Sequence, residues 1–182
     1  MADKSWKVIK SQQVVDNPYT QVFMQSIELP DGRLIEDWPI IQTLDYVNAL
    51  VLNDDGEAMI VEGYKHGIGR SSWQVVGGYL EPDEQPLAAI QRELLEETGC
   101  ASEDWVHLGS FTVDANRRVG EGHFFLARNA KKITEPSYND LEYFDLRWVS
   151  LDTLKVALRD GRVGVLSYAI NISLALNLLQ LQ

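Results

Sequence analysis

Hydrophobic and polar positions along this chain fall into short alternating runs and a few longer stretches with helical spacing. Short runs that end at Gly, Pro, Asn or Asp predict strands, because successive side chains of a strand point to opposite faces. The Pro30-Asp31-Gly32 and Asp54-Asp55-Gly56 turns each predict a hairpin. The expected strands are residues 20–29, a short strand after residue 32, and residues 46–52, 58–64, 73–76, 105–113, 123–127 and 143–149.

Three stretches predict helices. Residues 87–98 follow Pro86 and precede Gly99, which is the usual placement of Pro at the start and Gly past the end of a helix. Residues 151–158 and 165–179 complete the chain, and the second repeats apolar positions at i, i+3 and i+4, which predicts packing on the core. This order of strands, hairpins and helices predicts an α/β (α+β) class with helices on a mixed or antiparallel sheet.

Residues 1–40 predict a small β appendage, separate from a main domain over residues 41–182. Isolated hairpins are marginal in water, so the appendage needs something to cover its apolar side chains. Two arrangements would cover them: the segment folds back on its own sheet, or it packs across a two-fold axis in a homodimer. The side chains to be covered are Trp6, Val8, Ile9, Val22, Phe23, Met24, Ile27 and Trp38.

Composition and charge narrow the function classes. A chain of 182 residues with 45% hydrophobic content supplies a core of its own. With 16 basic and 27 acidic residues its net charge is −11, which argues against nucleic-acid or anionic-membrane partners. The single cysteine, Cys100, excludes an intrachain disulfide and is expected in the core. The polar first ten residues and the interrupted apolar stretch at 163–179 predict a cytoplasmic protein without a membrane span.

Three carboxylates crowd one side of the predicted helix at 87–98. Glu93, Glu96 and Glu97 lie within about one turn of each other, near the helix end where the dipole disfavours negative charge. Arg92 is placed to neutralise Glu96 at i+4, which would leave Glu93 and Glu97 more open to a cation. Mg²⁺ is held by carboxylates together with substrate phosphates, so a magnesium site explains this otherwise unfavourable pattern. A solvated acidic helix face is the alternative for the glutamates taken alone.

The full spacing around these glutamates, over residues 78–100, resembles the signature of the Nudix hydrolases, called the Nudix box: G-x5-E-x7-R-E-U-x-E-E-x-G-U with U aliphatic. The matching positions are Gly78, Glu84, Arg92, Glu93, Leu94, Glu96, Glu97 and Gly99, with Cys100 in place of the last aliphatic residue. The resemblance implies an α/β/α sandwich with a mixed sheet, a divalent metal (Mg²⁺ or Mn²⁺), and hydrolysis of a nucleoside diphosphate linked to another group.

The same resemblance implies roles for individual residues. Glu93 and Glu97 would bind metal, with Glu96 as a further ligand and the Gly77 carbonyl beside them. Gly78, Glu84, Arg92 and Gly99 would hold the loop and the helix in place. Glu97 and Glu93 also count as catalytic; the general base would come from the box or from a later loop, where Glu142 and Glu121 are candidates.

Beyond the box, the chain resembles the ADP-ribose pyrophosphatase branch, which implies a small-molecule nucleotide substrate and a homodimer formed partly by residues 1–40. Two features depart from that branch: residues 73–78 lack its Glu and Pro, and Asn116 stands where it has a proline. The candidate substrate contacts are Lys65, Arg70, Arg117 and Arg118, with Trp38 and Tyr46 as possible stacking partners for a base. Trp73 and Trp148 are expected in the core, and His66 and His107 are expected not to bind metal.

Two classes of function follow. The first is a catalytic Nudix pyrophosphatase acting on ADP-ribose or a related nucleotide sugar, with a dinucleotide or a nucleoside triphosphate as the alternative substrate class. The second is a non-catalytic, nucleotide-sensing module on the same scaffold. Because Glu93, Glu96 and Glu97 are all present, the sequence favours the enzyme.

Overall fold

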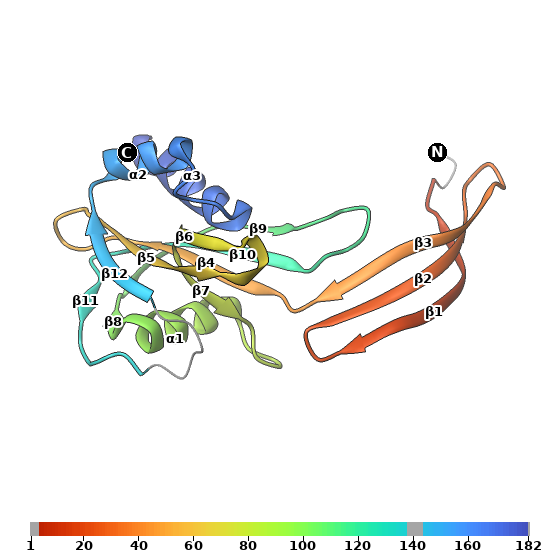
Figure 1. The fold of residues 1–182 in the computed structure, drawn as a ribbon, viewed down its shortest axis with the longest axis horizontal. Helices are drawn as coiled ribbons and strands as arrows, with labels where there is room; N and C mark the ends of the chain where they lie inside the picture. Colours follow the sequence, from red (N-terminus) through yellow and green to blue (C-terminus); the bar gives the residue numbers. More distant parts are fainter. Residues whose placement is uncertain (1–3, 138–143, 182) are drawn as a thin grey trace. The chain divides into compact units, whose positions relative to one another are not determined.

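The computed structural model describes residues 4–137 and 144–181. The chain forms two compact units: the first combines Met1–Asp45 with Phe111–Glu121, and the second combines Tyr46–Ser110 with Gly122–Gln182. Figure 1 shows the strands and helices of each unit along the chain.

The first unit contains a three-stranded antiparallel sheet in the order β1-β2-β3. Its strands are β1 (Lys7–Asn17), β2 (Thr20–Glu28) and β3 (Leu34–Thr43). The expected Pro-Asp-Gly turn joins β2 to β3, and Gly32 has φ +84°, a conformation that side chains with a Cβ rarely adopt. Of the described residues in this unit, only Ile27 is buried, so the sheet has almost no core of its own.

The second unit is built on two sheets, one in the order β7-β4-β10-β9 and one in the order β12-β5-β6. Strands β4 and β10 run parallel, whereas β4 with β7, β5 with β6 and β5 with β12 are antiparallel, which makes the arrangement mixed. The strands are β4 (Tyr46–Val51), β5 (Ala58–Lys65), β6 (Arg70–Gln74), β7 (Val76–Tyr79), β9 (Asp104–Thr112), β10 (Glu121–Arg128) and β12 (Phe144–Val149). A short pair, β8 (Cys100–Ala101) and β11 (Lys131–Lys132), lies beside them.

Helices cover both faces of these strands. In Figure 1, α1 (Pro86–Thr98) lies on one side, and α2 (Leu151–Asp160) and α3 (Leu166–Gln180) lie on the other. Side chains alternate along β4 and therefore reach two separate hydrophobic cores. Val47 and Ala49 pack with α1 in one of them, the α1 core, whereas Leu50 packs with α2 and α3 in the other. The expected α/β/α sandwich with a mixed sheet is therefore confirmed.

The ends of α1 follow from its sequence. Pro86 occupies the first turn, and Gly99 ends the helix with φ +70° while its N–H donates to the Leu95 carbonyl. A Cβ on Gly99 would collide with the Thr134 carbonyl, so no larger residue fits here without a shift. Cys100, the next residue, is buried in the α1 core as expected.

Strand β6 is an edge strand whose backbone is covered by the connection between α2 and α3. The Trp73 N–H donates to the Arg162 carbonyl, and the Gly164 N–H donates to the Ser72 hydroxyl. Arg162 also lays its guanidinium over the Trp73 ring, 4.3 Å from the ring centroid. This covering explains the burial of Ser72 and Trp73 at a position where an edge strand is usually exposed.

The structure differs from the sequence-based expectation in several places, which include the short strands β8 and β11. Strand β1 was not anticipated, and the expected strand at 73–76 is divided at Val75 into β6 and β7. Trp73 is in the core as expected, but the expectation for Trp148 is wrong, because 37% of that residue is exposed. None of the described helices is long and apolar enough to cross a bilayer.

Adjacent leucines of α1 give a direct test of this packing. Leu94 is fully buried among residues of the α1 core, whereas Leu95 is exposed. We expect Leu94→Ala to lower the free energy of unfolding by about 2–5 kcal/mol, because a cavity replaces buried methyl groups. Urea unfolding of both alanine variants measures this. Leu95→Ala serves as the control and should cost less than about 1 kcal/mol; equal losses would contradict the burial of Leu94.

Candidate active site

Two box carboxylates lie against the backbone where β7 turns toward α1. The Gly77 N–H donates to Glu97 Oε2 at 3.4 Å. A Cβ built on Gly78 would collide with the Glu93 carboxylate, so that carboxylate lies directly over the Gly78 Cα. Glycine at position 78 therefore provides the space that Glu93 occupies.

Arg92 joins three glutamates at this site. Its Nε and Nη2 donate to the two oxygens of Glu84 at 2.9 and 3.0 Å, a bidentate contact across the loop that precedes α1. Its Nη1 donates to Glu93 Oε1 at 2.8 Å and to Glu96 Oε2 at 3.1 Å. The expectation that Arg92 neutralises Glu96 while leaving Glu93 open is wrong in its second half, because the guanidinium contacts both.

The electrostatics of this group depend on the same contacts. Hydrogen bonding from Arg92 holds the pKa of the Glu84 carboxyl below its ordinary value, and the Glu81 backbone contributes in the same direction. Glu84 in turn raises the pKa of Arg92, with further contributions from Glu93 and Glu96. Glu84 also accepts a hydrogen bond from the Glu81 N–H, which folds the loop between β7 and α1.

The donor set suits a hard divalent cation. Glu93 and Glu97 present oxygen ligands beside the Gly77–Gly78 backbone, and Glu96 lies on the same side of α1. Across residues 4–137 and 144–181, no three His, Cys, Asp or Glu side chains are already gathered as a metal cluster.

The four cationic residues suggested as substrate contacts have different surroundings. Arg70 donates to the Gly161 carbonyl at 3.0 Å and so braces the connection between α2 and α3. Lys65, the last residue of β5, lies in the same unit as the box. Arg117 and Arg118 belong to the first unit, where Arg117 pairs with Asp114 at 2.8 Å and Arg118 has φ +57°.

The aromatic and acidic candidates also have defined places. Burial raises the pKa of Tyr46, whose hydroxyl contacts Ser167, and its ring lies edge-on to Phe124. The Trp38 indole donates to the Asn116 carbonyl at 2.9 Å within the first unit. Glu121 donates its backbone N–H to Asp45, whereas Glu142 lies outside the described residues.

One polar cluster of the second unit was missed by the sequence reasoning. His107 Nε2 lies 3.1 Å from Ser110 Oγ, and Ser110 Oγ lies 2.7 Å from His123 Nδ1. The sequence-based expectation for His107 concerned metal binding only. Local spacing does not reveal the cluster, because Ser110 meets His123 only through the pairing of β9 with β10.

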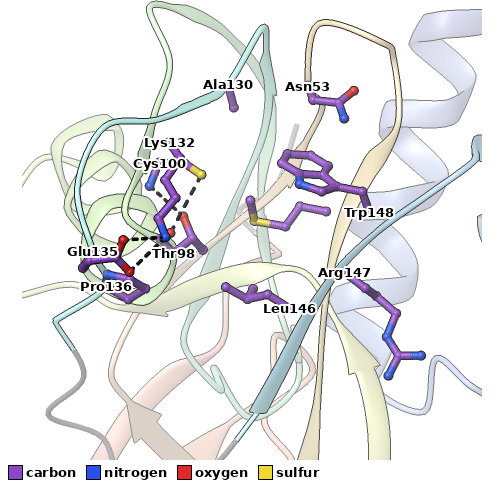
Figure 2. Close-up of a pocket in the computed structure, with 11 residues that line it drawn as sticks. Asn53, Thr98, Cys100, Ala130, Lys132, Glu135, Pro136, Leu146, Arg147 and Trp148 are labelled. Atoms are coloured by element: carbon purple, nitrogen blue, oxygen red, sulfur yellow. Dashed lines mark hydrogen bonds and ion pairs between the residues drawn. The ribbon is translucent and has the colours of Figure 1, made fainter.

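A cavity of about 590 Å³ opens beside the C-terminal end of α1. Figure 2 shows its wall, with Leu146 and Trp148 on one side and Thr98 and Cys100 on the other, and Met59 also lines the cavity. Lys132 at its rim pairs with Glu135 at 2.9 Å. Among the described residues that line it, none is a box glutamate, so the carboxylate site lies outside this cavity.

The contact between Glu84 and Arg92 predicts a pH-dependent stability. A carboxyl whose pKa is lowered by folding stabilises the fold above its ordinary pKa of about 4.3, and that stabilisation disappears as pH falls through the lowered value. We expect Glu84→Gln to lower the free energy of unfolding by about 1 kcal/mol at neutral pH. Below about pH 4 the difference from wild type should shrink. Urea unfolding across this pH range measures it; Glu103→Gln, an exposed control, should show neither effect. A loss that stays constant with pH would contradict the ion pair.

Comparison with known proteins supports the interpretation of the box. The NUDIX domain matches residues 43–166, and the Nucleoside diphosphate sugar hydrolase N-terminal domain matches residues 6–41. A methanol dehydrogenase activator of Bacillus methanolicus is 26% identical over 177 residues, which cover 97% of this chain and 93% of that protein. An ADP-ribose pyrophosphatase of Bacillus subtilis (strain 168) is 25% identical over 155 residues, which cover 85% of this chain and 80% of the relative.

A solved structure agrees in fold. The crystal structure of an ADP compounds hydrolase aligns with a TM-score of 0.84, covering 99% of this chain and 97% of that chain, at 16% sequence identity. The resemblance to the Nudix hydrolases, and within them to the ADP-ribose pyrophosphatase-like branch, is confirmed. Because the NUDIX domain spans more than half of the sequence and contains the whole box, this chain belongs to the Nudix family and is a Nudix pyrophosphohydrolase.

Proposed function

We propose that this protein hydrolyses the diphosphate linkage of ADP-ribose or a related nucleoside diphosphate sugar, in a reaction that requires Mg²⁺ or Mn²⁺. The products are a nucleoside monophosphate and a sugar phosphate. The observation that carries the proposal is the placement of Glu93 and Glu97 against the Gly77–Gly78 backbone, with Arg92 bound to Glu84, Glu93 and Glu96.

The metal would be held by Glu93, Glu97 and the Gly77 carbonyl, with Glu96 as a further ligand. When bound, a divalent cation neutralises the diphosphate charge and acidifies a water molecule. Arg92 fixes the position of the loop relative to the helix through its contact with Glu84, and it limits the repulsion between Glu93 and Glu96. Glu121, the first residue of β10, or Glu142 is the proposed acceptor of the proton from the attacking water.

Charge also bears on how the substrate is held. With a net charge of −11, the protein repels a free diphosphate, so the metal and local cations have to offset that repulsion. Lys65, Arg70, Arg117 and Arg118 remain the proposed contacts for phosphate or sugar, and Trp38 and Tyr46 the proposed partners for a base. The choice of a nucleotide sugar draws support from the ADP-ribose pyrophosphatase relative and from the match of residues 6–41 to an N-terminal domain of nucleoside diphosphate sugar hydrolases.

A substrate panel with a matched variant tests the function. Wild-type protein should convert ADP-ribose to AMP and ribose 5-phosphate with Mg²⁺ or Mn²⁺, and removal of the metal should abolish turnover. We expect Glu97→Gln to lower kcat at least about 100-fold with an intact fold, because even residues behind metal ligands cost 10- to 100-fold when changed. Chromatography of the products and circular dichroism measure these outcomes.

The panel also separates the alternatives. Glu103→Gln removes an exposed carboxylate outside the site and should retain wild-type turnover. Dominant release of inorganic pyrophosphate from a nucleoside triphosphate would place the protein among triphosphatases. Nucleotide binding without turnover of any substrate would favour a sensing module, and full activity of Glu97→Gln would exclude the metal assignment.

We further propose that the first unit forms a homodimer interface. Strand β1 is exposed along its whole length, and Val8 and Val15 are 52% and 44% exposed. A three-stranded sheet whose described part buries only Ile27 cannot be stable by hydrophobic burial within the unit. A second copy of the same sheet offers a matching apolar surface across a two-fold axis.

If the first unit forms the dimer interface, charged substitutions in β1 should lower the molar mass of the protein in solution. Wild-type protein should be dimeric at micromolar concentration, and the double variant Val8→Glu/Val15→Glu should be monomeric, because it would bury two unpaired charges. Multi-angle light scattering measures both. The matched control Gln12→Glu/Gln13→Glu adds the same charge at polar positions of β1 and should remain dimeric. A monomeric wild type would refute the interface.

A further inference from the structure

Gly77 and Gly78 are covered from opposite faces of the sheet. Gly78 lies beneath the Glu93 carboxylate on the side of α1, whereas the corresponding space over Gly77 is filled by the side-chain amide of Asn48. Asn48 stands directly opposite Gly77 in the pairing of β4 with β7. It points away from α1, because its neighbour Val47 packs with that helix. Each of the two glycines therefore has one side chain packed over it.

Strands β4 and β7 approach each other closely at Gly77. A Cβ on Gly77 would collide with the Asn48 amide nitrogen and also with the backbone carbonyl of Val47, so glycine is the residue that fits here. In the described part of the chain β7 is the outer strand of its sheet, and the Gly77 N–H donates to Glu97 on α1. The position of Gly77 therefore depends on β4 on one side and on Glu97 on the other.

The Asn48 amide is buried at a cost in stability. Asn48 is 3% exposed, and its Oδ1 has no hydrogen-bond partner among the described residues. A buried oxygen without a partner costs about 1–3 kcal/mol, which a leucine of similar size would avoid. The shape of the side chain gives a reason for asparagine. Its planar end is thinner than the branched end of leucine, so it fits where the two strands leave no room for a Cβ.

The hydrogen bond between Gly77 and Glu97 is sensitive to small displacements of β7. Its N···O distance is 3.4 Å, already beyond the usual range of about 2.7–3.2 Å for such a bond. A small movement of β7 away from α1 would break it. The same movement would carry the Gly77 carbonyl away from the Glu93 and Glu97 carboxylates, with which it is proposed to bind the metal.

We propose that Asn48 is a positioning residue for the metal site. It fixes the Gly77 peptide, so that the N–H stays bound to Glu97 and the carbonyl stays beside the carboxylates. Asn48 acts through Gly77 from the opposite face of the sheet and binds neither metal nor substrate itself. This inference rests on the proposed function, which assigns the metal to Glu93, Glu97 and the Gly77 carbonyl. It adds to the Nudix box a residue of another strand that the box spacing does not contain.

Binding of Mn²⁺ in the absence of substrate tests the proposal, with Asn171 as the matched control. Asn171 is also buried and has an unpartnered Oδ1, but it lies on α3 and donates to the Phe125 carbonyl on β10, two strands from β7. We expect Asn48→Ala to raise the Kd for Mn²⁺ about 10-fold, the lower end of the loss seen when residues behind metal ligands are changed. Asn171→Ala should destabilise the fold at least as much, because it also loses a hydrogen bond, yet leave the Kd within about twofold of wild type. Isothermal titration calorimetry and urea unfolding measure these outcomes.

Exchange of the Gly77 amide proton gives a readout that does not depend on metal. In metal-free protein, NMR should show faster exchange at Gly77 in Asn48→Ala than in wild type, because the bond to Glu97 opens more often. Asn171→Ala should leave this exchange unchanged. Asn48→Ser also removes the amide and should repeat both results, and it takes the place of Asn48→Ala if that variant does not fold.

Three results would overturn the proposal. They are an unchanged Kd for Mn²⁺ in Asn48→Ala, an equal rise of the Kd in the Asn48 and Asn171 variants, and unchanged amide exchange at Gly77. A wild-type protein that binds no Mn²⁺ would instead refute the metal site of the proposed function itself, whatever the variants do.

Discussion

The arrangement around α1 depends on one guanidinium that separates crowded carboxylates. Glu93, Glu96 and Glu97 lie close together on one helix, and Arg92 contacts two of them while it grips Glu84 across the preceding loop. Without this residue the helix end would carry uncompensated repulsion where its dipole already disfavours negative charge. Arg92 therefore fixes the loop geometry and offsets the charge of the neighbouring glutamates at the same time.

The sheet contributes a different kind of order. The residues of the Nudix box are close in sequence, so their spacing along the chain is enough to recognise them. Residues on separate strands are aligned only by strand register, as in the row formed by Gly78, Val47 and His123. Local spacing and strand register thus order different parts of the same fold.

The sequence predicted the features whose causes are local. Helix α1 has Pro86 and Gly99 at its ends, and the carboxylate side follows from helical spacing. The break at Val75 was missed because no Gly, Pro, Asn or Asp stands between Gln74 and Val76 to mark the change of sheet. Strand β1 was missed because its residues are exposed along the whole strand, so no alternation between buried and exposed positions marks it. The contact between Ser110 and His123 joins residues 13 positions apart on paired strands, which no single-sequence period reports.

The covered edge of β6 has a consequence for how copies of this chain associate. With the Arg162 carbonyl accepting from the Trp73 N–H, β6 presents less open backbone to which a foreign strand could add. Strand β1 is the outer strand of its own sheet, so half of its backbone groups have no neighbour within that sheet. Lys7 and Lys10 place positive charge along this edge, and like charges oppose the stacking of many parallel copies. The two edges are thus protected in different ways, β6 by backbone contacts and β1 by lysine charge.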